Sequence, residues 1–219
     1  AMALTEVVPM STPTVTCGAA MCRTRSAQPV NAGVPLRGSA AGAGGGTIVV
    51  RGTTGAWAGA GMTAGLIHIQ GNAGDFLGAA IPGDHQGMKG GAIVVSGNAG
   101  ARAGDRMRRG AILIEGGAGD YVASRMVAGT IAVWGTVGRF PALAMRRGTL
   151  LLRQAPAELL PTFSDCGQYP LSFLTLLVRS WRGLPGKFAG LPDTGLRVRR
   201  FMGDRANGGK GEILVTVGG

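Results

Sequence analysis

Gly91-Ala-Ile-Val-Val-Ser-Gly-Asn-Ala-Gly100 is one copy of a unit that recurs every nineteen residues through the middle of the chain. The units begin at Gly46, Gly65, Gly91, Gly110, Gly129 and Gly148. A methionine falls near the end of each of the first five: Met62, Met88, Met107, Met126 and Met145. A fixed short period is typical of a solenoid, because one unit can bury its apolar face only against a stacked copy.

The aliphatic residues inside each unit recur at every second position, as Ile93 and Val95 do, which is the spacing of a β-strand. Glycines beyond the strand mark turns that need a positive φ or a close approach to the next unit. No unit has room for a helix. The pattern therefore predicts an all-β fold, a right-handed parallel β-helix with coils of about nineteen residues, spaced about 4.8 Å apart, with the methionines filling its interior beside the strands.

Three regions follow from this pattern. The β-helix is predicted over residues 46–153, with seven extra residues between Gly65 and Gly91 that indicate an inserted loop. Residues 1–45 show almost no apolar periodicity, so we expect either a disordered extension or a segment that is not the native start, as after a frame error. Residues 154–219 predict a small α/β cap over the C-terminal edge of the solenoid, with a helix beginning at Pro170 and a β-hairpin of residues 195–202 and 212–217.

Composition restricts the partners and the compartment. The chain has 22 Lys and Arg against 11 Asp and Glu, a net charge of +11, and the excess is greatest over residues 46–153, where we expect an acidic partner. Three cysteines without a CxxC pair favour a reducing, cytoplasmic location. The longest apolar stretch, Leu171 to Val178, is too short to cross a bilayer. We expect neither a membrane nor a nucleic acid as a partner.

Few side chains suggest chemistry. His68 falls at an outward strand position and His85 lies beside Asp84 in the inserted loop, without the spacing of metal ligands. Short polar residues recur at fixed repeat positions, where turn formation explains them because Asn tolerates positive φ and such side chains bond nearby backbone: Asn72 and Asn98, Asp75 and Asp120. We therefore expect no catalytic residue and no metal site.

Two columns of side chains run along the predicted outer surface. One is mostly apolar and consists of Val49, His68, Val94, Leu113, Ala132 and Leu151. Either the C-terminal helix covers it, or an interface with a partner protein is formed by Val49, Val94, Leu113 and Leu151. The other column, named here the basic ladder, consists of Lys89, Arg108, Arg109, Arg146 and Arg147. It is either solvated surface charge or a surface for an anion, because stacked like charges repel unless they are splayed or paired.

The repeated signature resembles the β-helix shared by the C-terminal domain of the glutamate synthase large subunit and by the C-type subunit of formylmethanofuran dehydrogenase. The inserted loop Gly74-Asp-Phe-Leu-Gly-Ala-Ala-Ile-Pro-Gly-Asp-His-Gln-Gly-Met-Lys-Gly-Gly91 resembles the longer second-repeat loop of the latter family. Phe201-Met-Gly-Asp204, with Gly209-Lys-Gly-Glu-Ile-Leu214, is similar to its C-terminal end. The resemblance covers about Gly46 to Val217, and the leading strands of that family are not recognisable in residues 1–45.

The resemblance implies a non-catalytic scaffold subunit of a formylmethanofuran dehydrogenase-like formyltransferase/hydrolase complex in tetrahydromethanopterin-linked one-carbon metabolism. Other subunits of that complex would transfer a formyl group to a methanofuran-type carrier and release it as formate, and any molybdenum or tungsten pterin would belong to another subunit. This chain would bind no cofactor of its own, although its basic ladder would hold the glutamate-bearing tail of the carrier. The alternatives are a glutamate synthase-type β-helix domain of an amidotransferase and a free-standing carbohydrate-active β-helix.

Overall fold

The structure, a computed structural model, describes residues 14–17, 22–23, 29–30, 46–192 and 194–217. This part of the chain consists mainly of β-strands with one α-helix, and its largest sheet has ten strands in the order β1-β4-β5-β6-β7-β8-β9-β12-β11-β10. In that order the strands are β1 (Thr14–Cys17), β4 (Thr47–Val50), β5 (Leu66–Ile69), β6 (Ala92–Val95), β7 (Ala111–Ile114), β8 (Thr130–Val133), β9 (Arg147–Leu152), β12 (Lys210–Val217), β11 (Arg197–Gly203) and β10 (Ser164–Pro170). A separate pair joins β2 (Cys22–Arg23) to β3 (Pro29–Val30).

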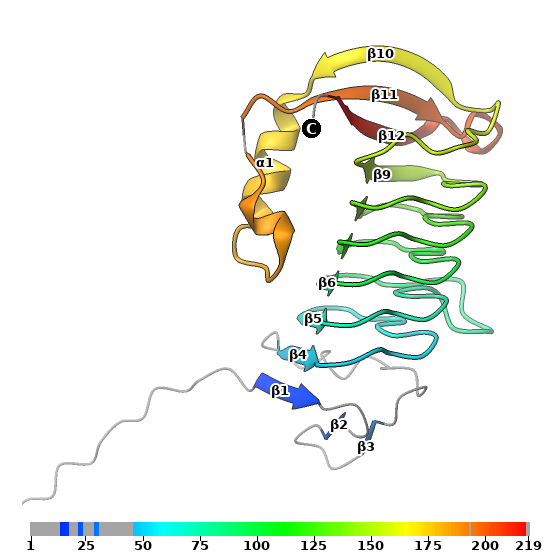
Figure 1. The fold of residues 1–219 in the computed structure, drawn as a ribbon. Coiled ribbons are helices and arrows are strands. Elements are labelled where there is room, and N and C mark those ends of the chain that lie inside the picture. Colours follow the sequence, from blue (N-terminus) through cyan, green and yellow to red (C-terminus); the bar gives the residue numbers. More distant parts are fainter. Residues whose placement is uncertain (1–13, 18–21, 24–28, 31–45, 193, 218–219) are drawn as a thin grey trace, which may run out of the picture.

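Strands β4 to β9 are parallel neighbours, one from each unit, and form the rungs of a stack (Figure 1). Equivalent residues lie in register, so that Ile93 is opposite Ile112 and Ile112 is opposite Ile131. The side chains of all three are fully buried. A second line of parallel bridges beyond the strands joins Thr54, Ala73, Ala99, Ala118 and Val137. The predicted strands and inward-facing aliphatic residues are thus confirmed.

The glycine that opens a unit and the methionine that ends one are coupled across neighbouring rungs. Gly110 has a φ of 100°, and a Cβ at this position would lie 2.6 Å from the Gly91 carbonyl oxygen and 2.8 Å from Met88 Cε. Met88 itself is fully buried. Glycine is therefore required twice over, by its backbone conformation and by the methionine packed against it.

A column of large side chains at one corner of the coils was not predicted. Its members share a left-handed backbone, with φ between 56° and 61°: Trp57, Phe76, Arg102, Tyr121 and Phe140. The rings of Trp57 and Phe76 stack with their centroids 4.8 Å apart, and those of Tyr121 and Phe140 are 5.5 Å apart. The guanidinium of Arg102 lies 4.8 Å from the centroid of the Tyr121 ring. Such pairs contribute about 0.5–1.5 kcal/mol each, which offsets part of the strain of non-glycine residues in this conformation.

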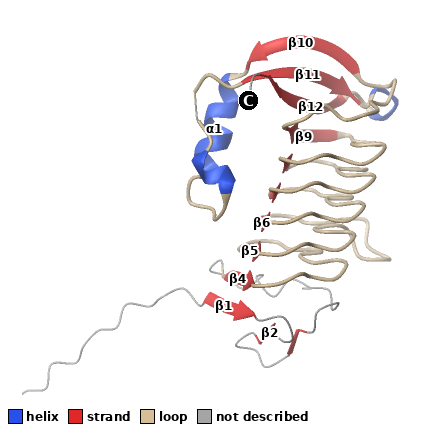
Figure 2. Cartoon of the chain, viewed as in Figure 1, coloured by secondary structure: helices blue, strands red, loops and turns tan. Residues whose placement is uncertain are grey.

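The C-terminal segment closes one end of the stack with three strands (Figure 2). β12 pairs in parallel with β9, β11 pairs antiparallel with β12, and β10 pairs antiparallel with β11. In sequence, Gly211-Glu-Ile-Leu-Val215 repeats the glycine-led pattern, and a Cβ on Gly211 would lie 2.8 Å from Met145 Sδ. β12 therefore takes the position of one more rung. The predicted hairpin of β11 and β12 is confirmed, whereas β10 was not predicted.

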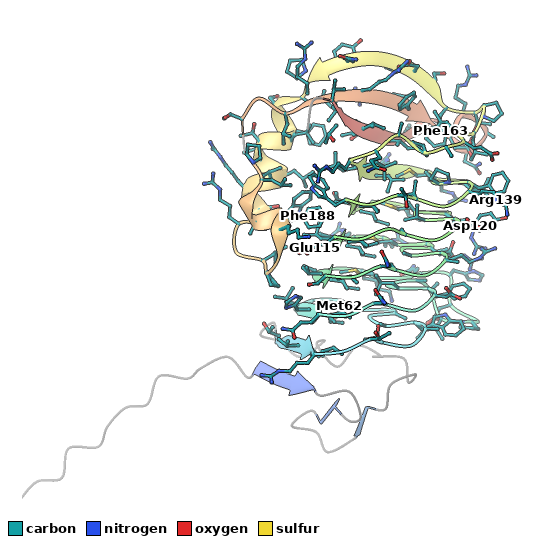
Figure 3. The ribbon with its side chains drawn as sticks, in the orientation of Figure 1. Met62, Glu115, Asp120, Arg139, Phe163 and Phe188 are labelled. Atoms are coloured by element: carbon teal, nitrogen blue, oxygen red, sulfur yellow. The ribbon has the colours of Figure 1, made fainter. Side chains whose placement is uncertain are left out.

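Helix α1 (Ser172–Trp181) and the short 3-10 helix η1 (Lys187–Gly190) lie along one side of the stack (Figure 1). Leu174, Val178 and Trp181 of α1 are buried, as predicted for one apolar face, together with Phe188 of η1. They form a second apolar cluster with the outward residues of the rungs, Val94, Leu113, Ala132 and Leu151. In Figure 3, Glu115 and Phe188 lie where η1 meets the rungs, and Glu115 Oε1 accepts a hydrogen bond of 2.7 Å from the Lys187 N–H.

The apolar column is therefore covered by the chain itself. Val94, Leu113 and Leu151 are at most 1 % exposed, so the alternative expectation, that these three residues contact a partner protein, is wrong. The physical reason is that α1 is too apolar to remain in water and packs on the nearest apolar surface. Val49 and His68, further down the stack, remain partly exposed.

Within residues 1–45 the structure describes three short strands. β1 pairs in parallel with β4, with Thr14 opposite Thr47 and Cys17 opposite Val50. A disordered or non-native segment was expected here. The other residues of this segment lie outside the described part of the chain.

Candidate functional site

The basic ladder follows Met88, Met107 and Met145, and its five side chains are exposed. Four of its residues lie in the turns before the next strand, and Arg147 is the first residue of β9. Backbone hydrogen bonds align it: Lys89 N donates to Met62 O, Arg108 N to Met88 O, and Arg146 N to Met126 O. Val127 occupies the equivalent position on the intervening rung, so the ladder is interrupted between Arg108 and Arg146. None of the five forms a salt bridge with a described acidic side chain.

Next to the ladder is a surface cavity of about 370 Å³, named here the basic pocket. It is lined by His85, Arg106, Arg125, Val127, Ala144, Arg146 and Asn207. Of the ladder residues, only Arg146 contributes to its wall. Arg106 and Arg125 occupy equivalent positions on successive rungs, and Arg146 lies on the rung after that. No acidic side chain is among the lining residues.

Arg125 is held in place from behind by a buried carboxylate. Its Nε donates to Asp105 Oδ1 at 2.9 Å and its Nη2 to Asp105 Oδ2 at 2.6 Å. Ser124 Oγ donates to the same Oδ1 at 2.7 Å, and Asp105 is only 3 % exposed. A bidentate contact of this kind, with two N–H groups bonded to one carboxylate, fixes the plane of the guanidinium. Arg125 is thus oriented, and its charge is balanced by Asp105.

Arg106 is restrained by the inserted loop. Its Nη1 donates to the carbonyl oxygen of Asp84 at 3.2 Å and lies 3.3 Å from His85 Nδ1. Asp84 contributes its backbone carbonyl oxygen and not its carboxylate. The neighbouring loop residues Asp84 and His85 thus both contact Arg106.

The C-terminal cap supplies the opposite wall. Asp204 precedes the 3-10 helix η2 (Arg205–Asn207), and its Oδ1 accepts a hydrogen bond from Ala206 N at 3.0 Å. Its Oδ2 accepts from Asn207 Nδ2 at 3.0 Å and from Ala144 N, in the last coil, at 3.1 Å. Burial alone would raise the pKa of the Asp204 carboxyl, but these donors and the nearby Thr162 hydroxyl outweigh it and lower the pKa. The Phe201–Asp204 motif thus fixes Asn207 at the pocket.

The other polar residues singled out in the sequence make structural contacts. Asn72 Oδ1 accepts from Asn98 N at 2.8 Å, across one rung. Asp120 Oδ1 accepts from Arg139 N on the next rung at 2.7 Å, and these two residues are labelled in Figure 3. These side chains do bond backbone, but the backbone belongs to the next rung and not to their own turn, and neither asparagine has a positive φ, so the predicted turn role is wrong. His68 Nε2 lies 3.3 Å from Ser96 Oγ; burial lowers the pKa of its ring, and the charge of Glu115 opposes this only in part.

No group of three or more His, Cys, Asp or Glu side chains placed to hold a metal ion is found in the part of the chain that the structure describes. Nor does any helix within it have the length and apolar character needed to span a bilayer.

The chain is similar to a protein of known structure. No family model and no curated protein matches the sequence. Among solved structures, the chain is similar to a chain of the formyltransferase/hydrolase complex FhcABCD from Methylorubrum extorquens, crystallised in complex with methylofuran. The two chains are 45% identical and superpose with a TM-score of 0.73 over 80% of this chain and 64% of the other. The chain thus spans a little under two thirds of the length of its counterpart. In sequence and in fold, it is similar to a component of that formyltransferase/hydrolase complex.

Proposed function

We propose that this chain is the C-type subunit of a formyltransferase/hydrolase complex and acts there as a scaffold. The observation that carries the proposal is the similarity to a chain of FhcABCD, at 45% identity and a TM-score of 0.73. The match extends over 80% of the chain, which is more than the repeats of residues 46–153 alone. The likeness therefore involves the cap as well as the stack.

The acidic side chains support a structural rather than a catalytic role. Asp105 is paired with Arg125, Asp204 holds the cap to the last coil, and Glu115 holds the start of η1. Each of these carboxylates holds two segments of the chain together, which supports a structural role for it. The parallel, in-register rungs support the further proposal that residues 46–153 form a right-handed parallel β-helix, a regular stack well suited to hold other subunits at fixed positions.

In the proposed complex the chemistry takes place on other subunits. A formyl group passes from a tetrahydromethanopterin carrier to a methanofuran-type carrier and is released as formate in the cytoplasm. The ligand named for the FhcABCD structure, methylofuran, supports a carrier of this class. Where a related complex contains a molybdenum or tungsten pterin, that group belongs to another subunit.

Co-purification tests this proposal. When the chain is tagged and co-expressed with the candidate partner subunits, we expect a stoichiometric complex with formyl-transfer or hydrolase activity, and an inactive chain when it is expressed alone. Transfer or hydrolysis of a formyl group by the isolated chain would contradict the scaffold role. A chain that purifies free of those subunits would contradict membership of the complex.

We also propose that the basic ladder guides the glutamate-bearing tail of the carrier. Five exposed cations without described acidic partners support this. If Arg108, Arg109, Arg146 and Arg147 are changed together to Gln, the complex should bind the carrier more weakly. It should also show a smaller salt dependence of binding than the wild type, because added salt screens exposed charges. Equal salt dependence in the two proteins would exclude this role.

A further inference from the structure

The basic pocket is the place where both irregular segments of the chain meet. The stack is regular except for the insertion near residues 80–86 and the cap after residue 153. The insertion brings His85 to one wall, and the cap brings Asn207 to another. Periodic stacking alone would produce a flat, repeating flank. The two departures from the repeat instead enclose a cavity around three arginines.

The charges of the pocket are not balanced from within. Arg125 is compensated by Asp105, which lies behind it. Among the described residues, Arg106 bonds to the carbonyl oxygen of Asp84 and lies 3.3 Å from His85 Nδ1, and neither Arg106 nor Arg146 forms a salt bridge with a described acid. Asp105 balances Arg125 alone, so the charges of Arg106 and Arg146 have no described counter-ion in the wall of the pocket.

The spacing of the arginines indicates the shape of the anion. Arg106 and Arg146 originate two rungs apart, roughly 10 Å along the stack, with Arg125 between them. One carboxylate accepts two parallel N–H bonds from a single guanidinium. Two carboxylates joined by a short chain can satisfy two guanidiniums at once. A cavity of about 370 Å³ has room for such a molecule.

We propose that the basic pocket binds a dicarboxylate, with one carboxylate on Arg106 and the other on Arg146, and Arg125 between them. This binding site goes beyond the scaffold role and does not require assembly into a complex. His85 and Asp84 position Arg106 through the inserted loop, and Asp105 positions Arg125.

The test is a titration of the isolated full chain with glutarate, followed by the NMR signals of the arginine Nε–H groups. Acetate and inorganic phosphate serve as parallel probes. We expect glutarate to bind more tightly than either of them. In the double variant Arg106→Gln and Arg146→Gln, glutarate binding should weaken at least about tenfold, as expected when charge-assisted bonds are lost. The double variant Arg51→Gln and Arg139→Gln removes the same charge at two exposed arginines outside both the pocket and the ladder, and it should weaken binding less than about threefold.

A second pair of variants keeps all the arginines. Val127→Glu places a carboxylate in the pocket wall and should abolish glutarate binding, whereas Val127→Gln, of the same size but uncharged, should retain most of it. Equal losses of glutarate affinity in the two double variants would show that glutarate responds only to the overall positive charge of the surface, and would overturn the proposal. Tighter binding of phosphate than of glutarate would overturn the ligand class. Either result leaves the co-purification test of complex membership unaffected.

Discussion

At the scale of single residues, contacts between rungs hold the repeat together. Asn72 and Asp120 bond the backbone of the following unit and not of their own. The opening glycine Gly110 meets Met88 of another unit. Each of these residues contacts a neighbouring unit as well as its own. A substitution at one of them therefore disturbs the packing of two units.

Gly110→Ala should lower the free energy of unfolding by about 2–4 kcal/mol. The left-handed backbone costs a residue with a Cβ about 1–2 kcal/mol, and the overlap with Met88 and the Gly91 carbonyl adds a packing cost of similar size. Urea denaturation would measure the change. Gly183→Ala is the matched control, because a Cβ there meets nothing within 4 Å, and it should change stability by less than about 0.5 kcal/mol. Equal effects in the two variants would contradict the coupling.

The Asp204 carboxyl links stability to pH. Its pKa is lower in the folded chain than the ordinary value of about 3.9. The ionised form therefore stabilises the fold above that value, and this contribution is lost as the pH falls through the lower, folded pKa. Melting temperatures of the wild type and of Asp204→Asn should differ most near neutral pH and approach each other below about pH 4. A difference that stays constant from neutral to acid pH would exclude this linkage.

The sequence predicts the inward aliphatics and the glycines well, because both recur at fixed spacing. The stacked corner was missed although Trp57, Phe76 and Tyr121 also recur with the repeat. The reason is conformational: aromatic residues rarely adopt a positive φ, so the spacing by itself does not place them in a turn. The stacking of rings on neighbouring rungs offsets part of that conformational cost.

At the scale of elements, α1 joins the cap to the coils. Its inner face buries Leu174 and Val178 against the outward residues of the rungs, while Leu176 is 69% exposed. The helix thus protects a surface that the repeat pattern alone would leave apolar and open to water. Its contribution to stability depends on that one face.

Leu174→Ala should cost about 2–5 kcal/mol of unfolding free energy, the usual range for a buried leucine. Leu176→Ala, on the exposed side of the same helix, should cost less than about 0.5 kcal/mol. Thermal or urea unfolding of the pair measures both. Similar losses in the two variants would mean that α1 does not pack on the rungs as described.

Elements whose own residues show an apolar period were predicted from the sequence. β10, which is a strand only through its pairing with β11, was not predicted. α1 and the hairpin of β11 and β12 show their own periodicity in the sequence. β10 consists mostly of polar and exposed residues, including Gln168 and Tyr169, and it is a strand only because β11 lies beside it. Its place in the sheet is decided by the fold of the cap.

At the scale of the whole molecule, the candidate site combines residues that lie far apart in the chain. The basic ladder was predicted because its members recur at two adjacent repeat positions, directly after the methionines. The basic pocket was not, because His85 comes from an insertion and Asn207 from the cap, and no period relates them to Arg106. The sequence indicates the order of the rungs but not where the irregular segments fold back onto them.

The pairing of β12 with β9 has a consequence for biosynthesis. The two strands are adjacent in the sheet, yet Lys210 follows Leu152 by 58 positions along the chain. At about 5–20 residues per second, the ribosome needs roughly 3–12 s to add that segment. Throughout this interval the edge of β9 that later pairs with β12 has unpaired backbone N–H and C=O groups. The nascent chain is therefore most exposed to edge-to-edge aggregation after its coils have formed, and least so once Val217 has emerged.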